Sequence, residues 1–155
     1  MPSIKAIPDG YPQITPYLVV DGASEAIEFY KSVFGFTERM RMPGTEGRVG
    51  HAELALGDAM LMLADEYPEM GIRSARSIGG SPVSIVLYVE RVDDVVAAAL
   101  AAGAKEVRPV EDKFYGDRAG QIEDPWGHVW DVMTHIEDVS PEEMGRRMAA
   151  MSEQA

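Results

Sequence analysis

The chain contains no cysteine at any of its 155 positions. Disulfide bonds, thiolate nucleophiles and metal sites built on cysteine sulfur are therefore excluded. No apolar run approaches the roughly 20 residues that a transmembrane helix needs. The first twelve residues hold one lysine, several prolines and no apolar segment, so they do not read as a secretory signal peptide. We therefore expect a cytoplasmic protein without a membrane partner.

Positive charge is also scarce, since 14 Lys and Arg stand against 26 Asp and Glu and the net charge is -12. Such a field repels phosphate backbones, so nucleic acid is not expected as a partner, and it weakly favours cationic ligands. Hydrophobic residues make up 46% of the chain, which is enough for a buried core. At this length the chain is expected to form one domain, or two small modules that share a core.

The sequence describes nearly the same unit twice. Residues 17–21 are strand-like and run into an amphipathic stretch at 23–34 that ends at Gly35. About seventy residues later, 87–90 run into 92–102, which end at Gly103. Each copy is followed by extended segments, and one such unit cannot bury its apolar face alone. Two packed copies leave a seam between them, which is where pockets form.

Turn residues and alternating apolar residues divide each copy further. The expected segments of the first copy are a strand at 14–20, a helix at 23–34 that Asp21 or Ser24 caps, and strands at 36–42, 48–56 and 59–64. Residues 65–82 form a glycine-containing connection, which we interpret as a linker rather than a functional loop. The expected segments of the second copy are strands at 84–89, 105–111, 121–123 and 128–134, a helix at 92–102, and a turn at 124–127. A last helix begins at a capping box at Ser140 and carries a stripe of Met144, Met148 and Met151, expected to be a packing surface.

Alternation within the first hairpin separates two faces. Ala52, Leu54 and Leu56 form an aliphatic face, which we expect helices to cover. His51, Glu53 and Met62 would then point to the concave side of the sheet.

Three segments carry a family resemblance: Phe29-Tyr-Lys-Ser-Val-Phe-Gly-Phe36, His51-Ala-Glu-Leu54 and Asp124-Pro-Trp-Gly-His-Val-Trp130. In this order, and on an internal repeat, they resemble the vicinal oxygen chelate superfamily of glyoxalase I and the bleomycin-resistance proteins. The resemblance spans about residues 14–135. Tyr115-Gly-Asp-Arg118 and Thr134-His-Ile-Glu-Asp138 are most similar to its PhnB-like branch.

The resemblance implies an α+β fold in which two βαβββ modules form a curled, mixed, eight-stranded sheet around a cleft. It also implies a homodimer. The expected organisation is a single domain over 1–155, with module one at about 11–66, a linker at 67–82, module two at about 83–136 and a C-terminal helix at about 140–152.

Members with enzymatic activity hold a divalent metal with residues of the first, fourth, fifth and eighth strands. Aligned by strand ends, these positions fall on Ile14, Met62, Ser84 and Asp131, of which only Asp131 is a conventional ligand for a hard cation. A shift by one residue does not improve the set. His51, Glu53 and Asp131 could form an unorthodox metal triad, but we prefer a hydrogen-bonded polar network. No metal and no cofactor are therefore expected.

The remaining histidines are expected to be structural or superficial: His128 at the Asp124 turn and His135 at a strand end. The expected ligand-binding residues are Met60, Met62, Tyr88, Tyr115, Arg118, Trp126 and Met133, with Val86 beside them. For Trp126 simple turn packing is an equal alternative. For Tyr115, Asp117 and Arg118 the equal alternative is a turn network in which Arg118 pairs with Asp117.

The function that this pattern favours is metal-independent binding of a planar or cationic small molecule in the cleft. The alternative is a lyase, isomerase or transferase that uses His51, Glu53 or Asp131 as acid or base, with a carboxyl pKa raised by an apolar pocket. A third possibility is a structural or regulatory dimer with a vestigial pocket.

Overall fold

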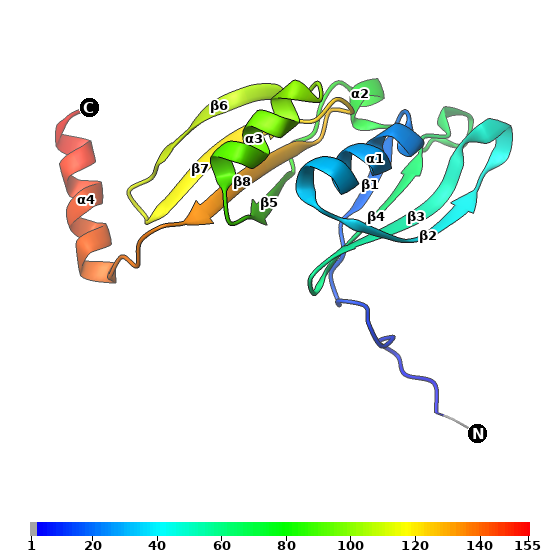
Figure 1. Cartoon of the computed structure of the whole chain (residues 1–155), viewed down its shortest axis with the longest axis horizontal. Helices are drawn as coiled ribbons and strands as arrows, with labels where there is room; N and C mark the ends of the chain where they lie inside the picture. Colours follow the sequence, from blue (N-terminus) through cyan, green and yellow to red (C-terminus); the bar gives the residue numbers. More distant parts are fainter. Residues whose placement is uncertain (1–2) are drawn as a thin grey trace. The chain divides into compact units, whose positions relative to one another are not determined.

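The computed structural model describes residues 3–155, and the chain divides into two compact units at Gly80 and Ser81. The division falls within the segment expected as a linker. Eight strands form two mixed, four-stranded sheets, each with a helix between its first and second strand, so the expected α+β fold with two βαβββ modules is confirmed (Figure 1). No helix in the described part of the chain is both long and apolar enough to cross a membrane.

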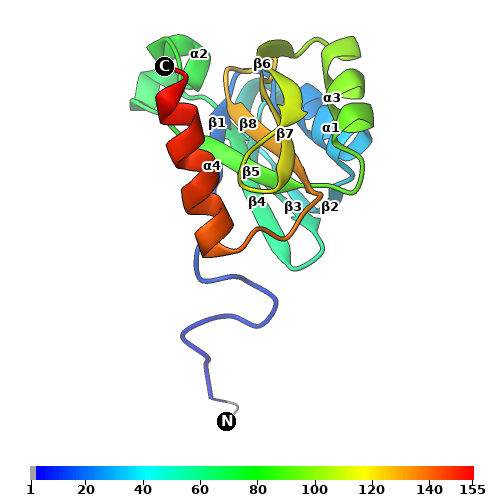
Figure 2. The ribbon, with the colours of Figure 1, turned by 90° about the vertical axis from the view of Figure 1, so that its left-hand side faces the viewer.

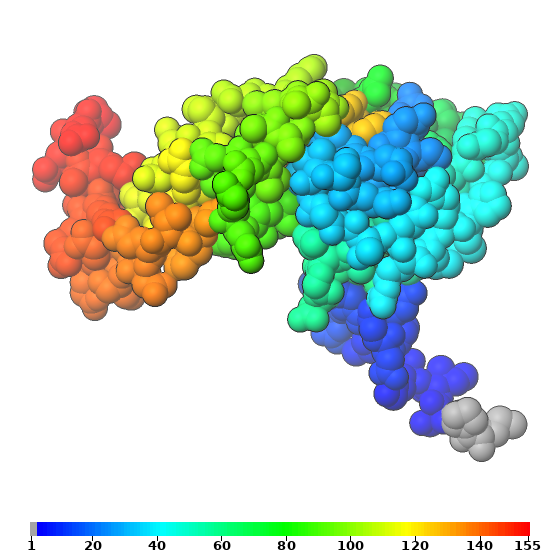
Figure 3. All heavy atoms as spheres, in the orientation of Figure 1, coloured from blue at the N-terminus to red at the C-terminus, as the bar shows by residue number. Residues whose placement is uncertain are grey.

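The first unit has the strand order β1-β4-β3-β2, with β1 parallel to β4 and the other pairs antiparallel. Its elements are β1 (Tyr17–Val20), α1 (Ala23–Phe34), β2 (Thr37–Pro43), β3 (Val49–Leu56) and β4 (Ala59–Asp65). Helix α1 lies over one face of this sheet and hides much of it in the space-filling view (Figures 1 and 3). Ile27 and Tyr30 of α1 and Leu54 and Leu63 of the sheet are fully buried, as the alternation of the hairpin predicts.

The start of α1 corrects one detail of the sequence analysis. Neither Asp21 nor Ser24 caps the helix, because its N-cap is Gly22, which adopts a left-handed conformation at φ 112° and offers no side chain. Asp65, at the end of the neighbouring strand β4, fills this role. Its Oδ1 accepts the backbone amides of Gly22 and Ala23 at 2.9 and 2.8 Å, and its Oδ2 accepts the amide of Val49 at 2.7 Å.

Short helices occupy the connections that the sequence left without structure. They are η1 (Thr45–Gly47), η2 (Pro68–Met70) and α2 (Ala75–Ile78). Ser74 is fully buried and caps α2 by accepting the amide of Ser77, while its own amide donates to the carboxylate of Glu66. The predicted linker is therefore tied to the end of the first unit by a polar network.

The second unit repeats the topology with the order β5-β8-β7-β6. Its elements are β5 (Ser84–Tyr88), α3 (Val92–Ala101), β6 (Lys105–Asp112), β7 (Asp117–Glu123), β8 (Val129–His135) and α4 (Pro141–Glu153). Strand β7 begins at Asp117, earlier than the expected 121, because residues 117–120 pair with β8 in an unbroken ladder. Trp130, Ile122 and Val132 form the buried centre on the face that α3 covers.

Polar contacts attach helix α4 to the second unit. None of its residues is buried, and Figure 2 shows it as a separate helix in front of the sheet of this unit. The guanidinium of Arg147 donates to the backbone oxygen of Phe114 at 2.9 Å and pairs with the carboxylate of Glu137. The predicted capping box is confirmed in part, since the hydroxyl of Ser140 accepts the amide of Glu143.

Candidate functional site

The face of the first sheet opposite α1 carries a chain of four hydrogen-bonded side chains. The hydroxyl of Tyr17 and Nδ1 of His51 are 2.9 Å apart, and Nε2 of His51 lies 3.1 Å from Oε1 of Glu53. Oε2 of Glu53 accepts the hydroxyl of Tyr11 at 2.8 Å. The strand register places Glu53 beside Met62, and Met62 beside Tyr17. The expected polar network around His51 and Glu53 is therefore present.

Glu53 is nearly buried, with 6% of its surface exposed. Burial raises the pKa of this carboxyl, but the hydrogen bonds from His51 and Tyr11 together outweigh burial and bring the pKa below its ordinary value. Burial, followed by the nearby Glu53, raises the pKa of Tyr17. Glu53 is therefore ionised near neutral pH and orients His51, and the expectation of a raised carboxyl pKa is wrong at this residue.

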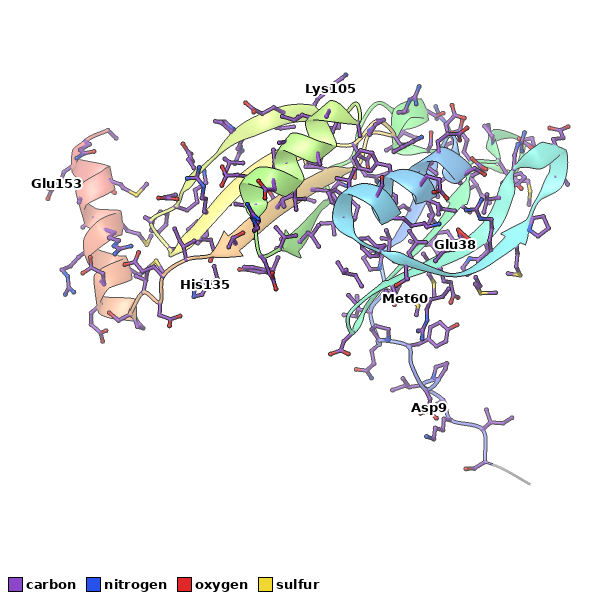
Figure 4. The ribbon with its side chains drawn as sticks, in the orientation of Figure 1. Asp9, Glu38, Met60, Lys105, His135 and Glu153 are labelled. Atoms are coloured by element: carbon purple, nitrogen blue, oxygen red, sulfur yellow. The ribbon has the colours of Figure 1, made fainter. Side chains whose placement is uncertain are left out.

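The first strand is shorter than expected from the sequence. The residue on it that corresponds to a metal ligand of the superfamily enzymes therefore changes. Ile14 lies outside the sheet and is 89% exposed. Pro16 has no amide hydrogen, so the ladder cannot continue through it towards Ile14. Tyr17 instead is the residue that pairs with Met62. Met60 lies near the start of β4 and is buried (Figure 4).

The open face of the second sheet carries a row of paired residues that crosses all of its strands. Arg108 of β6 pairs with Gln121 of β7, Gln121 pairs with Asp131 of β8, and Asp131 pairs with Val86 of β5. Nε2 of Gln121 donates to Oδ1 of Asp131 at 2.8 Å. Directly paired residues project to the same face of a sheet, so the charged side chains of Arg108 and Asp131 share one surface.

A hollow of about 230 Å³ lies on this face. It is lined by Arg108, Lys113, Tyr115, Ala119, Gly120, Gln121, Asp131 and Met133. We call it the β6–β8 hollow. Tyr115, Asp131 and Met133, expected to bind ligand or act at the site, thus meet at one place. Arg108, Lys113 and Gln121 also line the hollow, although no motif in the sequence indicated them.

Tyr88 lies on the same sheet but outside the lining of the β6–β8 hollow. Its hydroxyl donates to Oδ2 of Asp117 at 2.9 Å, and Nδ1 of His135 lies 2.7 Å from Oδ1 of the same carboxylate. Nε2 of His135 lies 2.8 Å from Asp138. Contact with Asp138, and next with Asp117, raises the pKa of His135. Figure 4 shows His135 at the end of the sheet away from Lys105.

Arg118 is separated from the other expected ligand-binding residues of this unit. Adjacent residues of a strand point to opposite faces, so Arg118 projects towards α3 while Asp117 projects to the open face. Its guanidinium pairs with Asp93 of α3 and with Asp112 at 2.8 and 2.9 Å, so the alternative in which it pairs with Asp117 is wrong. Arg118 lines a separate depression beside the start of α3.

Trp126 belongs to the turn that joins β7 and β8. Its side chain is buried, and its amide donates to Oδ1 of Asp124 at 2.9 Å. The amide of His128 donates to the same oxygen at 3.0 Å. The structure thus places both residues in the packing and hydrogen bonding of the turn.

The residues at the positions that correspond to metal ligands in the superfamily enzymes do not fit a divalent cation. The first unit offers a phenol at Tyr17 and a thioether at Met62, and the second offers Ser84, Val86 and a single carboxylate at Asp131. A hard divalent ion takes several carboxylate, imidazole or carbonyl donors together. Within residues 3–155, no group of three or more His, Cys, Asp or Glu is arranged to hold a metal ion.

Comparisons with known proteins agree with this fold. The family model described as Glyoxalase/Bleomycin resistance protein/Dioxygenase superfamily matches residues 10–132. An uncharacterized protein of Mycobacterium bovis is 42% identical over 146 residues, which cover 92% of this chain and 94% of that protein.

Solved structures show the same arrangement of elements. Protein PA1353 from Pseudomonas aeruginosa has a TM-score of 0.68 and 26% identity, with 82% of this chain and 100% of that chain covered. A PhnB protein from Bacillus cereus has a TM-score of 0.65 and 21% identity, with 79% and 99% covered, and at this identity the likeness concerns the fold alone.

Proposed function

The chain belongs to the glyoxalase/bleomycin resistance protein/dioxygenase superfamily, and on this premise we propose that it binds a small, planar organic molecule without the help of a divalent metal. The site is the β6–β8 hollow. Family membership alone does not decide between binding and catalysis, because one fold hosts many functions. The proposal therefore depends on the residues of the hollow.

One observation carries it: the hollow gathers an aromatic ring, a thioether and several polar groups on an open sheet face. Tyr115 offers a flat surface for stacking, and the flexible side chain of Met133 adapts to irregular shapes. Gln121 and Asp131 supply the few directed polar contacts that orient a ligand. The lack of a suitable donor set at Tyr17, Met62 and Val86 supports binding without a metal.

Two measurements test the proposal. Native mass spectrometry of the protein as purified is expected to show a small organic adduct, and metal analysis is expected to show no stoichiometric Ni, Zn, Mn or Fe. Tyr115→Ala is expected to weaken retention of the adduct. Tyr88→Ala is the matched control, because it removes an exposed tyrosine of the same unit that lies outside the hollow. A full equivalent of divalent metal, or equal losses in both variants, contradicts the proposal.

Acid–base chemistry at His51 is a second candidate function, favoured by the Tyr17–His51–Glu53 chain. Glu53 is ionised and accepts from Nε2, which leaves the lone pair of Nδ1 facing the hydroxyl of Tyr17. A carboxylate on one ring nitrogen and a hydroxyl at the other is also the arrangement around the imidazole of a hydrolase triad. The function would be exchange of a carbon-bound proton of the substrate.

Solvent deuterium exchange into hydroxyacetone, followed by proton NMR with EDTA present, tests this second candidate. Exchange above background is expected with the wild type, and His51→Gln and Glu53→Gln are expected to remove it. Tyr88→Phe is the control, since it alters a tyrosine–carboxylate contact in the other unit. No exchange by the wild type, or exchange that survives His51→Gln, excludes the candidate for this class of carbon acid.

A homodimer in the cytoplasm completes the proposal. The methionine stripe of α4 supports self-association, since Met148 and Met151 are 52% and 53% exposed. Analytical ultracentrifugation at micromolar concentration is expected to give about twice the chain mass of 16.9 kDa, and Met148→Lys to reduce it. A single-chain mass for the wild type at that concentration would count against the dimer.

A further inference from the structure

The β6–β8 hollow has an unusual balance of charge for this chain. The protein carries a net charge of -12, yet the lining of the hollow contains the cations Arg108 and Lys113 and the single carboxylate Asp131. Nearby charges act most strongly over a few ångströms, and those beyond roughly 8 Å are screened at physiological salt. The charges of the lining therefore determine what this surface attracts more than the overall charge does.

Arg108 is the cation without a local counter-charge. Within residues 3–155 its guanidinium makes no hydrogen bond or ion pair, whereas Lys113 pairs with Glu111. The register explains why Arg108 does not pair with Asp131. Gln121 lies between them in the row of paired residues, and neighbouring strands are about 4.8 Å apart. A free guanidinium presents a planar fork of donors that suits a carboxylate or phosphate.

Asp131 has the complementary requirement. Gln121 donates to its Oδ1, and no residue in the described part of the chain donates to its Oδ2. An ionised carboxylate only accepts hydrogen bonds, so a ligand beside it must offer a donor such as an amine or a hydroxyl. A second anion at this point would be repelled.

We infer that the natural ligand combines an anionic group, held by Arg108, with a hydrogen-bond donor, held by Asp131, on a short apolar or aromatic body that contacts Tyr115 and Met133. An amino acid or a similar zwitterion has this chemistry. The inference rests on the proposed function, because it names the ligand class of the same hollow. The volume of about 230 Å³ lies below the roughly 300 Å³ at which ordinary ligand pockets begin, which favours a molecule of amino-acid size.

Three probes that share a benzene ring test the inference: L-phenylalanine, 3-phenylpropionate and phenethylamine. They are zwitterionic, anionic and cationic near neutral pH. Titrations followed by amide NMR, with the signals of Gln121 and Met133 as reporters, are expected to rank phenylalanine first, phenylpropionate second and phenethylamine last. Binding of phenethylamine ahead of the other two would show that the overall negative charge dominates, and would overturn the inference.

Two variants assign the contacts. Arg108→Gln is expected to lower the binding affinity for phenylalanine and for phenylpropionate by about tenfold, the loss typical of one charge-assisted hydrogen bond. Asp131→Asn is expected to lower the binding affinity for phenylalanine, while the affinity for phenylpropionate stays the same or rises. Lys105→Gln is the control: it removes an exposed cation of the same strand that does not line the hollow (Figure 4), and no change is expected.

The outcomes separate this inference from the proposed function. If all three probes bind with equal affinity, or Lys105→Gln acts as strongly as Arg108→Gln, the ligand class is wrong while binding in the hollow stands. If no probe shifts the reporter signals at millimolar concentration while the purified protein still carries an adduct outside the hollow, the hollow is not the ligand site. Both the proposed binding in the hollow and the proposed ligand class are then wrong.

Discussion

The indole of Trp130 donates from Nε1 to Oδ2 of Asp124 at 2.9 Å. Trp130 is the largest fully buried side chain of the chain, and Asp124 is almost as deeply buried. The other oxygen of Asp124 accepts the backbone amides of Trp126 and His128. The segment Asp124-Pro-Trp-Gly-His-Val-Trp130, which carries much of the family resemblance, therefore serves first to join β7 and β8 around one buried carboxylate.

Asp124→Ala is expected to lower the free energy of unfolding by about 3 kcal/mol, because buried donors left without an acceptor each cost about 1–3 kcal/mol. Urea denaturation followed by tryptophan fluorescence measures the loss. Asp58→Ala is the control, since Asp58 is exposed at the β3–β4 turn. An Asp124 variant as stable as the control would show that water replaces the carboxylate.

Asp65→Ala is expected to destabilise the first unit by about 2–3 kcal/mol, because the start of α1 loses the carboxylate that accepts the amides of Gly22 and Ala23, and the amide of Val49 is orphaned. Amide hydrogen exchange in residues 22–26 should rise with the loss of stability. Protection of α1 that remains unchanged would contradict this role.

Thr134 performs the corresponding task in the second unit. Its hydroxyl accepts the amide of Val92 at the start of α3 and donates to the backbone oxygen of Val89. Because only one helix amide depends on it, Thr134→Val is expected to cost about 1 kcal/mol, less than Asp65→Ala. Thermal unfolding of the two variants side by side tests the order, and a larger loss in the threonine variant would reverse it.

The raised pKa of His135 predicts a dependence of stability on pH. The folded protein holds this proton more tightly than the unfolded chain, whose histidine pKa is 6.5. The contribution is therefore complete below that pH and is lost as pH rises through the folded pKa. Proton NMR is expected to give a midpoint above 6.5 for His135, which Asp138→Asn lowers. A midpoint at or below the unfolded value in the wild type would refute the interaction.

Arg147→Gln is expected to release α4 without unfolding the sheet, because this side chain joins the helix to Phe114 and Glu137 and no residue of the helix is buried. Limited proteolysis within 141–153 should accelerate while the unfolding midpoint changes little. Arg146→Gln is the matched control, since Arg146 pairs with Glu143 of its own helix. Equal proteolysis of both variants would mean that another contact holds α4.

The elements that the sequence predicted well are those with strong local signals. The stripe of Ile27 and Tyr30, the stop at Gly35 with φ 85° and the alternation of Leu54 with its neighbours all follow from local geometry. The family resemblance extended these segments to the repeated fold. The first strand was predicted to begin at residue 14, but Pro16 has no amide hydrogen and the strand begins after it.

Some residues and contacts of the candidate site were not predicted, and the cause is different. Register shifts on either side of Arg108 alter the alternation of β6, so simple counting from Lys105 would place Arg108 beneath α3. The partners of Arg118 lie on α3 and β6, at Asp93 and Asp112, and no sequence spacing indicates them.

The sequence by itself determined the repeated module, the position of its helices and the scarcity of metal ligands, because these depend on residue type and on the periods of helix and strand. Only the tertiary structure decided which side chains share a surface. A bulge, a turn and the pairing of distant strands bring Arg108, Gln121 and Asp131 into one row, and a one-residue change of register in any strand would send its side chains to the opposite face.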